Sequence, residues 1–351
     1  MSKTHTLKIL LITVLILSVL ICFNRCNQVS DYLIDNNSKK INYNNIYTYA
    51  HPMFWIDYNT IYYAKSGLYN NTFYYADENG KHKITSDLSF NLFDEIGLNG
   101  EFHDIQAYGD NIYMLYQNED GIKSFYLFSK ESKTHKKLFT PKDNINEWAV
   151  VDNILIFSTF LGNGEIDVNS LWLYRIDKDT LEPISNETTA FGIANNQIRY
   201  IERNADGKNE LYSFDADSKT SELICLFDYH NQIYNDYNFT EDYLVFFKNG
   251  LSVLNLKNGD IKNYQLPGYA KFMSCYENFA FVAFETSVYR INLTNGESQV
   301  IVEDLQECNL IYALNNEQAV IVCYENSDSL LMSVKVYKIS VDGKMAKLMM
   351  I

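Results

Sequence analysis

Basic side chains are scarce in this sequence. Lysine and arginine number 29, against 44 aspartates and glutamates, and the formal net charge is −15. A phosphate backbone is bound by clustered Lys and Arg, so this balance argues against a nucleic-acid partner. An acidic surface is also repelled by anionic lipid headgroups. We therefore expect contact with a membrane only through an N-terminal anchor.

Proline and glycine are also few, with 4 and 15 residues among 351. Apolar residues make up 47% and aromatic residues 15%, including 28 tyrosines. This apolar content excludes a disordered chain, because burial of these side chains offsets the entropy lost on ordering. No stretch after residue 30 shows helical periodicity with caps, whereas aromatic and β-branched residues favour strands. We predict an all-β protein.

Catalytic signatures are absent. The sequence has no Gly-x-Ser-x-Gly elbow and no P-loop, and its histidines show no metal-ligand spacing. We therefore predict no catalytic residue, no metal and no cofactor, and a protein that is not an enzyme. A hydrolase or lyase that uses acids with His51 or His103 over a central channel is the least favoured alternative.

Two groups of acidic and amide residues have both a chemical and a structural interpretation. Hard oxygen ligands around a turn glycine suit calcium, and they occur at Asn204, Asp206, Gly207, Asn209 and Glu210. Acid pairs such as Asp215 with Asp217 and Asp177 with Asp179 resemble glycosidase carboxylates. The spacing favours hairpin turns in both cases, because Asp and Asn accept hydrogen bonds from nearby backbone.

Aromatic residues that could stack on a glycan are Trp55, Trp148, Tyr229, Tyr234 and Tyr237. The segment 228–238, polar and rich in tyrosine, is the best candidate for a binding loop. A carbohydrate- or small-ligand-binding module is therefore the second hypothesis.

The N-terminus predicts export. Residues 1–8 form a basic cytoplasmic n-region, 9–23 an apolar signal anchor or signal peptide, and 24–40 a polar tether. Bulky residues before the cysteines and a missing small-x-small site favour an uncleaved anchor, with lipoprotein and secreted forms as alternatives. We expect residues from about 30 onward on the extracytoplasmic face.

Four cysteines, Cys225, Cys275, Cys308 and Cys323, lie scattered in apolar segments and are expected to be buried free thiols. Cys308 with Cys323 is the one pair worth testing for a disulfide.

An internal repeat is the strongest signal. Seven segments begin with an acidic or Asn turn and continue as an apolar strand, with Ile61, Ile112, Ile154, Ile198, Leu244, Phe279 and Ala319 as equivalent positions. The steps between them are 51, 42, 44, 46, 35 and 40 residues. Such a period with short strands is typical of propeller blades. We predict a β-propeller of seven four-stranded blades over residues 41–351, in which residues 41–50 either add a strand beside the last blade or lead into the first.

Two stretches carry a family resemblance. Ile61-Tyr62-Tyr63-Ala64 followed by residues 73–80 (FYYADENG) resembles the repeats of bacterial exported propellers grouped as a domain of unknown function. These repeats are similar to lipoprotein-receptor propellers with a Tyr-Trp-Thr-Asp core, to which Phe54-Trp55-Ile56-Asp57 is similar. The resemblance implies an exported propeller used for binding. Our leading hypothesis is a membrane-anchored, non-catalytic module that binds an envelope or cell-wall protein, with a glycan as the alternative partner.

Overall fold

The computed structural model describes residues 54–57, 60–65, 72–77, 80–83, 101–118, 120–129, 131–132, 134–160, 169–194, 196–227, 237–248, 250–305, 308–325 and 333–350. These residues form strands and turns, and none of their segments is a helix long and apolar enough to cross a membrane. The predicted n-region, anchor and tether, residues 1–40, lie outside the described residues, as does the candidate closing segment 41–50.

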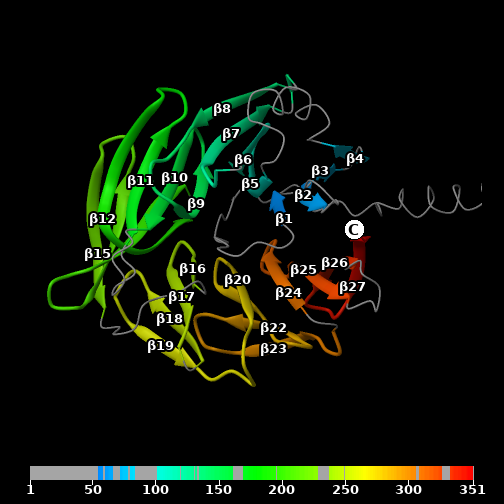
Figure 1. Ribbon diagram of the computed structural model, residues 1–351. Helices are drawn as coiled ribbons and strands as arrows, with labels where there is room; N and C mark the ends of the chain where they lie inside the picture. The colour runs from blue at the N-terminus through cyan, green and yellow to red at the C-terminus, as the bar shows by residue number, and fades with distance from the viewer. Residues whose placement is uncertain are drawn as a thin grey trace, which may run out of the picture.

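The strands form a ring of antiparallel sheets, which gives the protein a β-propeller-like fold (Figure 1). The first sheet contains β1 (Phe54–Asp57), β2 (Thr60–Lys65), β3 (Thr72–Asp77) and β4 (Gly80–Lys83). The second contains β5 (Glu101–Tyr108), β6 (Asn111–Gln117), β7 (Lys123–Ser129) and β8 (His135–Phe139). Each strand pairs with the one before it, so each sheet is a simple meander.

The third sheet has seven strands among the described residues: β9 (Ile145–Val151), β10 (Ile154–Phe160), β11 (Asn169–Arg175), β12 (Thr180–Ala194), β13 (Gln197–Arg203), β14 (Asn209–Asp215) and β15 (Thr220–Phe227). The 15-residue strand β12 pairs with β11 through Thr180–Thr188 and with β13 through Thr188–Ala194. Pro183 lies in the first half of β12, which pairs with β11 on one edge only. The other edge of this half forms no ladder, so the missing N–H of proline is tolerated there.

The remaining three sheets again have four strands each in the described part of the chain. They contain β16 (Tyr237–Phe239), β17 (Tyr243–Phe247), β18 (Leu251–Asn255) and β19 (Ile261–Tyr264); β20 (Phe272–Tyr276), β21 (Phe279–Ala283), β22 (Val288–Asn292) and β23 (Ser298–Val302); and β24 (Cys308–Ala313), β25 (Gln318–Glu325), β26 (Ser333–Ser340) and β27 (Met345–Met350).

The predicted repeat coincides with this architecture. Its seven apolar segments are β2, β6, β10, β13, β17, β21 and β25, the strands that follow the first tight turn of each unit. Asp152, Asn196 and Glu277 take positive φ angles of 51°, 61° and 47° in these turns. The all-β expectation is confirmed.

The first strand of each sheet lies on the inner side of the ring, and contacts between sheets run in sequence through β1, β5, β9, β12, β16, β20 and β24, with β12 connecting β9 to β16. The apolar core lies between the faces of neighbouring sheets. One cluster joins Tyr243 and Val253 to Cys275 and Val282, and the next joins Phe281 to Ile311 and Ile321. Both faces of strands such as β10 and β17 are buried, so these strands lose the alternation of apolar and polar residues.

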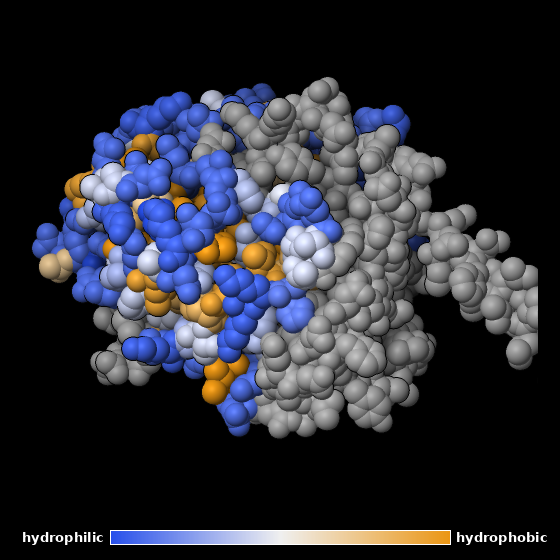
Figure 2. Space-filling view, turned by 90° about the horizontal axis from the view of Figure 1, so that it is seen from above, coloured by the Kyte–Doolittle hydropathy of each residue, from blue (hydrophilic) through white to orange (hydrophobic). Residues whose placement is uncertain are grey.

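The outer surface is mainly hydrophilic on the side seen in Figure 2, where apolar side chains appear in small groups among polar ones. This hydrophilic surface agrees with the acidic composition. Polar groups also occur on the inner strands, where they are buried.

Candidate functional site

Side chains on β5, β9 and β16 form hydrogen bonds between three sheets, and the bond from β16 to β9 passes beside Phe191 of β12. We call Asp104, Glu147, Trp148 and Tyr237 the inner-strand cluster. Glu147 and Trp148 are adjacent on β9 and therefore point to opposite sides of their sheet. Trp148 bonds to Asp104 on β5, whereas Glu147 bonds to Tyr237 on β16.

Asp104 is a half-buried carboxyl with two protein donors. The Trp148 indole Nε1 donates to its Oδ2 at 2.7 Å, and the Ile105 backbone N–H donates to its Oδ1 at 2.8 Å. Burial raises the pKa of Asp104 to about 7, against the opposing effect of these hydrogen bonds and of Lys123. The carboxyl therefore exchanges its proton near neutral pH, which is the range a general acid or base needs.

Glu147 is more deeply buried, at 7% exposure. Burial raises its pKa to about 7, although the hydrogen bond from Tyr237 opposes that shift. The Tyr237 Oη lies 3.0 Å from Glu147 Oε2 and 2.9 Å from the Phe191 carbonyl oxygen, and it accepts the Phe191 N–H at 3.1 Å. A phenol has one proton, so the Glu147 carboxylate and the Phe191 carbonyl compete for it, and a charged Glu147 is only weakly stabilised by this contact.

Two buried amides join inner strands in the same manner. Gln106 on β5 donates to the Trp148 carbonyl at 2.7 Å and accepts the Val150 N–H at 3.2 Å. Asn238 on β16 donates to the Met273 carbonyl at 3.3 Å and accepts the Cys275 N–H at 3.2 Å. In each case the side chain satisfies a carbonyl and the N–H two residues later on the next inner strand, which fixes the angle between neighbouring sheets.

The burial of two aromatic residues corrects their predicted role in glycan stacking. Trp148 and Tyr237 are 3% and 7% exposed, and both are engaged in contacts between sheets. Tyr229 and Tyr234 lie outside the described residues, together with most of the proposed binding loop. Trp55 belongs to β1, and its side chain is not described.

The predicted histidine and acid candidates are dispersed. His51 is outside the described residues, and His103 is on β5 with its side chain not described. Asp215 Oδ1 accepts the N–H groups of Asp217 and Ser218, so this pair makes a turn. These backbone donors lower the pKa of Asp215.

The calcium candidate is also built as a turn. Asn204 Oδ1 accepts the N–H groups of Asp206 and Lys208 at 3.1 and 3.0 Å, and its Nδ2 donates to Glu210. The described residues contain no group of three or more His, Cys, Asp or Glu side chains placed to hold a metal ion.

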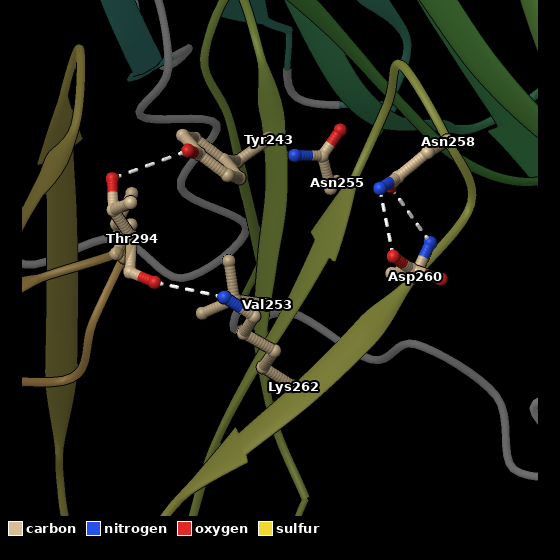
Figure 3. A pocket seen from close by; sticks show the side chains of 8 residues that line it. Tyr243, Val253, Asn255, Asn258, Asp260, Lys262 and Thr294 are labelled. Atoms are coloured by element: carbon tan, nitrogen blue, oxygen red, sulfur yellow. Dashed lines mark hydrogen bonds between the residues drawn. The ribbon is translucent and has the colours of Figure 1, made fainter.

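A small cavity of about 110 Å³ lies between the sheets β16–β19 and β20–β23 (Figure 3). Its polar groups already bond one another. Lys262 Nζ donates to the Thr294 carbonyl at 2.9 Å, and Asn258 Nδ2 donates to Asp260 at 2.7 Å. The Tyr243 hydroxyl lies 3.3 Å from Thr294 Oγ1. The cavity is thus a polar seam between two sheets, held by these hydrogen bonds between its lining residues.

Sequence reasoning missed Asp104 and Glu147. The available signal was an acidic residue inside an apolar strand, as in residues 145–151 (INEWAVV). Their partners could not be inferred, because Glu147 and Tyr237 are 90 residues apart in the chain.

No family model matches the sequence, and no curated protein matches it. Solved structures do share the fold. An acylaminoacyl peptidase in complex with Z-Gly-Gly-Phe-chloromethyl ketone aligns with a TM-score of 0.56 at 10% identity, over 87% of this chain and 52% of the peptidase chain. A chain from a structural and mechanistic analysis of two prolyl endopeptidases aligns with a TM-score of 0.57 at 9% identity. The alignment covers 87% of this chain and 49% of that chain.

The propeller domain of the Trilobed protease from Pyrococcus furiosus, described as having an open velcro topology, aligns with a TM-score of 0.56 at 11% identity, over 87% of this chain and 95% of that domain. The chain thus matches a propeller domain almost end to end. It spans about half the length of the acylaminoacyl peptidase and prolyl endopeptidase chains.

These similarities correct the functional hypothesis. A non-catalytic scaffold for an envelope or cell-wall protein, and the expectation that the protein is not an enzyme, are both wrong in view of structural neighbours that come from peptidases and hydrolases. The scaffold hypothesis rested on the absence of catalytic signatures in the sequence, and a fold by itself does not specify a function.

Proposed function

We propose that this chain is a propeller of hydrolase type that binds peptides at the inner-strand cluster. The observation that carries the proposal is the alignment of 87% of the chain with peptidase propellers, one of which is a defined domain of a protease. The inner-strand cluster supplies two carboxyls with a pKa of about 7 on adjacent inner strands. Asp104 is the more accessible of the two and is assigned to contact the peptide backbone.

The groups that cleave the peptide bond are assigned to a unit outside the described strands. His135, on the outer strand β8, is the one histidine whose side chain the described residues place. The peptidase chains that share this fold are about twice as long as the part matched by the chain. In this proposal the propeller selects and positions the substrate.

Peptide binding tests the proposal directly. We expect the purified full-length protein to bind a fluorescein-labelled, N-blocked Gly-Gly-Phe peptide, measured by fluorescence anisotropy. Asp104→Asn removes the charge that strengthens a hydrogen bond to the peptide, and a weakening of about tenfold in Kd is expected. Cleavage is followed in the same samples by chromatography.

Asp110→Asn is the matched control, because Asp110 is an exposed turn residue on the same sheet. Its Kd should equal that of the parent protein. Binding without cleavage supports a catalytic unit elsewhere, and binding with cleavage supports a hydrolase whose reactive groups lie within this chain. No binding at millimolar peptide, or equal weakening by both substitutions, contradicts the proposal.

We further infer that the ring has seven four-stranded blades. In this interpretation β12 is the outer strand of one blade and the inner strand of the next, so the seven-stranded sheet counts as two blades. Seven equivalent repeat strands and the successive contacts of the inner strands support the count. An experimental density map along the ring axis is expected to show seven units, and six or eight would contradict it.

A further inference from the structure

Two thiols face each other in the last sheet. Cys308 is the first residue of β24 and lies directly opposite Cys323 on β25. Both are free cysteines, with exposed fractions of 0% and 1%. Residues directly opposite in an antiparallel pair have Cα atoms about 4.5–5.5 Å apart, which is within the range that a disulfide spans. The register therefore places the two cysteines at a Cα spacing compatible with a disulfide.

The surroundings of the pair differ between the two thiols. Cys308 Sγ lies 3.5 Å from the Leu310 carbonyl oxygen, and the two thiols hydrogen-bond to each other. That contact and burial raise the pKa of Cys308, whereas the hydrogen bond and Lys335, opposite Cys323 on β26, lower the pKa of Cys323. Cys323 is therefore the thiol that ionises first and the better nucleophile.

We propose that Cys308 and Cys323 are a redox-active pair that closes into a cross-strand disulfide. The oxidant is a small or protein disulfide, RSSR, which reaches the buried thiols when the irregular end of the β24–β25 ladder opens locally. The Cys323 thiol loses its proton, and its thiolate attacks one sulfur of RSSR, which forms a mixed disulfide and releases RS⁻. Cys308 then loses its proton and attacks Cys323 Sγ, which closes the bond and releases the second RS⁻. The protein loses two hydrogens, and RSSR is reduced to two RSH.

The position of the pair gives the bond a structural role. The ladder between β24 and β25 shifts register between Cys308 and Leu310, so the pair lies at an irregular end of the sheet. All four described strands of this sheet come from residues 308–350, and all four of the first sheet come from residues 54–83. The bond would fasten the inner strand β24 to its neighbour in the last sheet of the ring.

Mass spectrometry of the native full-length protein tests the proposal. Trypsin releases both cysteines in one peptide, residues 291–335, because no Lys or Arg lies between Arg290 and Lys335. After incubation of the reduced protein with oxidised glutathione and alkylation, we expect this peptide to be unalkylated and lighter by two hydrogens. Because the bond restricts the unfolded chain, Tm should rise by about 5 °C relative to the reduced protein.

Cys275 is the internal control. It is buried on β20 opposite Ala280, and its tryptic peptide should contain a free thiol throughout. Cys323→Ser should remove the rise in Tm, while Cys275→Ala should retain it. The proposal is overturned if peptide 291–335 is alkylated on both cysteines, or if it carries glutathione without internal bonding. This mass readout requires no variant to fold.

Discussion

Replacing Gly192 by alanine is expected to destabilise the protein by about 3 kcal/mol, at the upper end of overpacking effects. A Cβ at this position would lie 2.3 Å from Cδ2 of Phe239. Phe239 on β16 is 1% exposed and lies in a buried apolar cluster with Ala190 and Ala194 of β12, and such close-packed interiors resist the displacement of a ring. Urea unfolding followed by tryptophan fluorescence measures the change in the free energy of unfolding.

Gly268→Ala is the matched control. A Cβ at Gly268 would lie 3.8 Å from Cδ1 of Phe284, an ordinary contact, so its stability should change by less than about 0.5 kcal/mol. If the Phe239 ring is the cause, Phe239→Leu should recover part of the loss in the Gly192→Ala background, as a double-mutant cycle would show. Strict additivity of the two substitutions would contradict the explanation.

The second large effect is a dependence of stability on pH that comes from Glu147. Its pKa rises from 4.5 to about 7 on burial, so the folded state binds the proton more tightly than the unfolded state. The contribution of Glu147 to the free energy of unfolding is fully present below pH 4.5, and it is lost as the pH rises to about 7. The shift corresponds to about 3 kcal/mol. Glu147→Gln, which mimics the neutral acid, should therefore be more stable than the parent at pH 8 and similar at pH 4.

Urea titrations at several pH values measure this difference. Glu222→Gln is the control, because Glu222 is exposed on the outer strand β15. Its stability should follow the parent protein at every pH. A Glu147→Gln variant that is less stable than the parent at pH 8 would show that the charged carboxylate is preferred in the folded state, contrary to the expectation.

The repeat in the sequence predicted the strands because its signals are local. Asn and Asp at turn positions, glycine at Gly259, Gly296 and Gly343 with φ of 75°, 78° and 80°, and apolar runs between them all act within one hairpin. The pairing of Cys308 with Cys323 could also be suspected from the sequence, since both lie within one predicted unit.

The inner-strand cluster could not be predicted in this way. Its bonds link residues from different sheets, and the strand pattern does not specify which side chains meet across a ring. The continuous strand β12 was also missed, because the step between Ile154 and Ile198 is 44 residues, close to its neighbours. Pro183 is the one local signal that this segment has an unpaired strand edge. It does not indicate that the same strand continues to Ala194.

The continuous strand β12 restricts how the gene for this ring can change. Between the other described sheets, a connection lies outside the ladders, so a unit can be gained, lost or exchanged by recombination at that connection. Thr188 pairs with both β11 and β13, and no loop separates the two halves of β12. A crossover at this point would cut β12 and divide the seven-stranded sheet in the middle. We therefore expect residues 145–227 to be inherited as one block, and chimeras joined within 180–194 to be insoluble where chimeras joined at residue 140 or 268 are soluble.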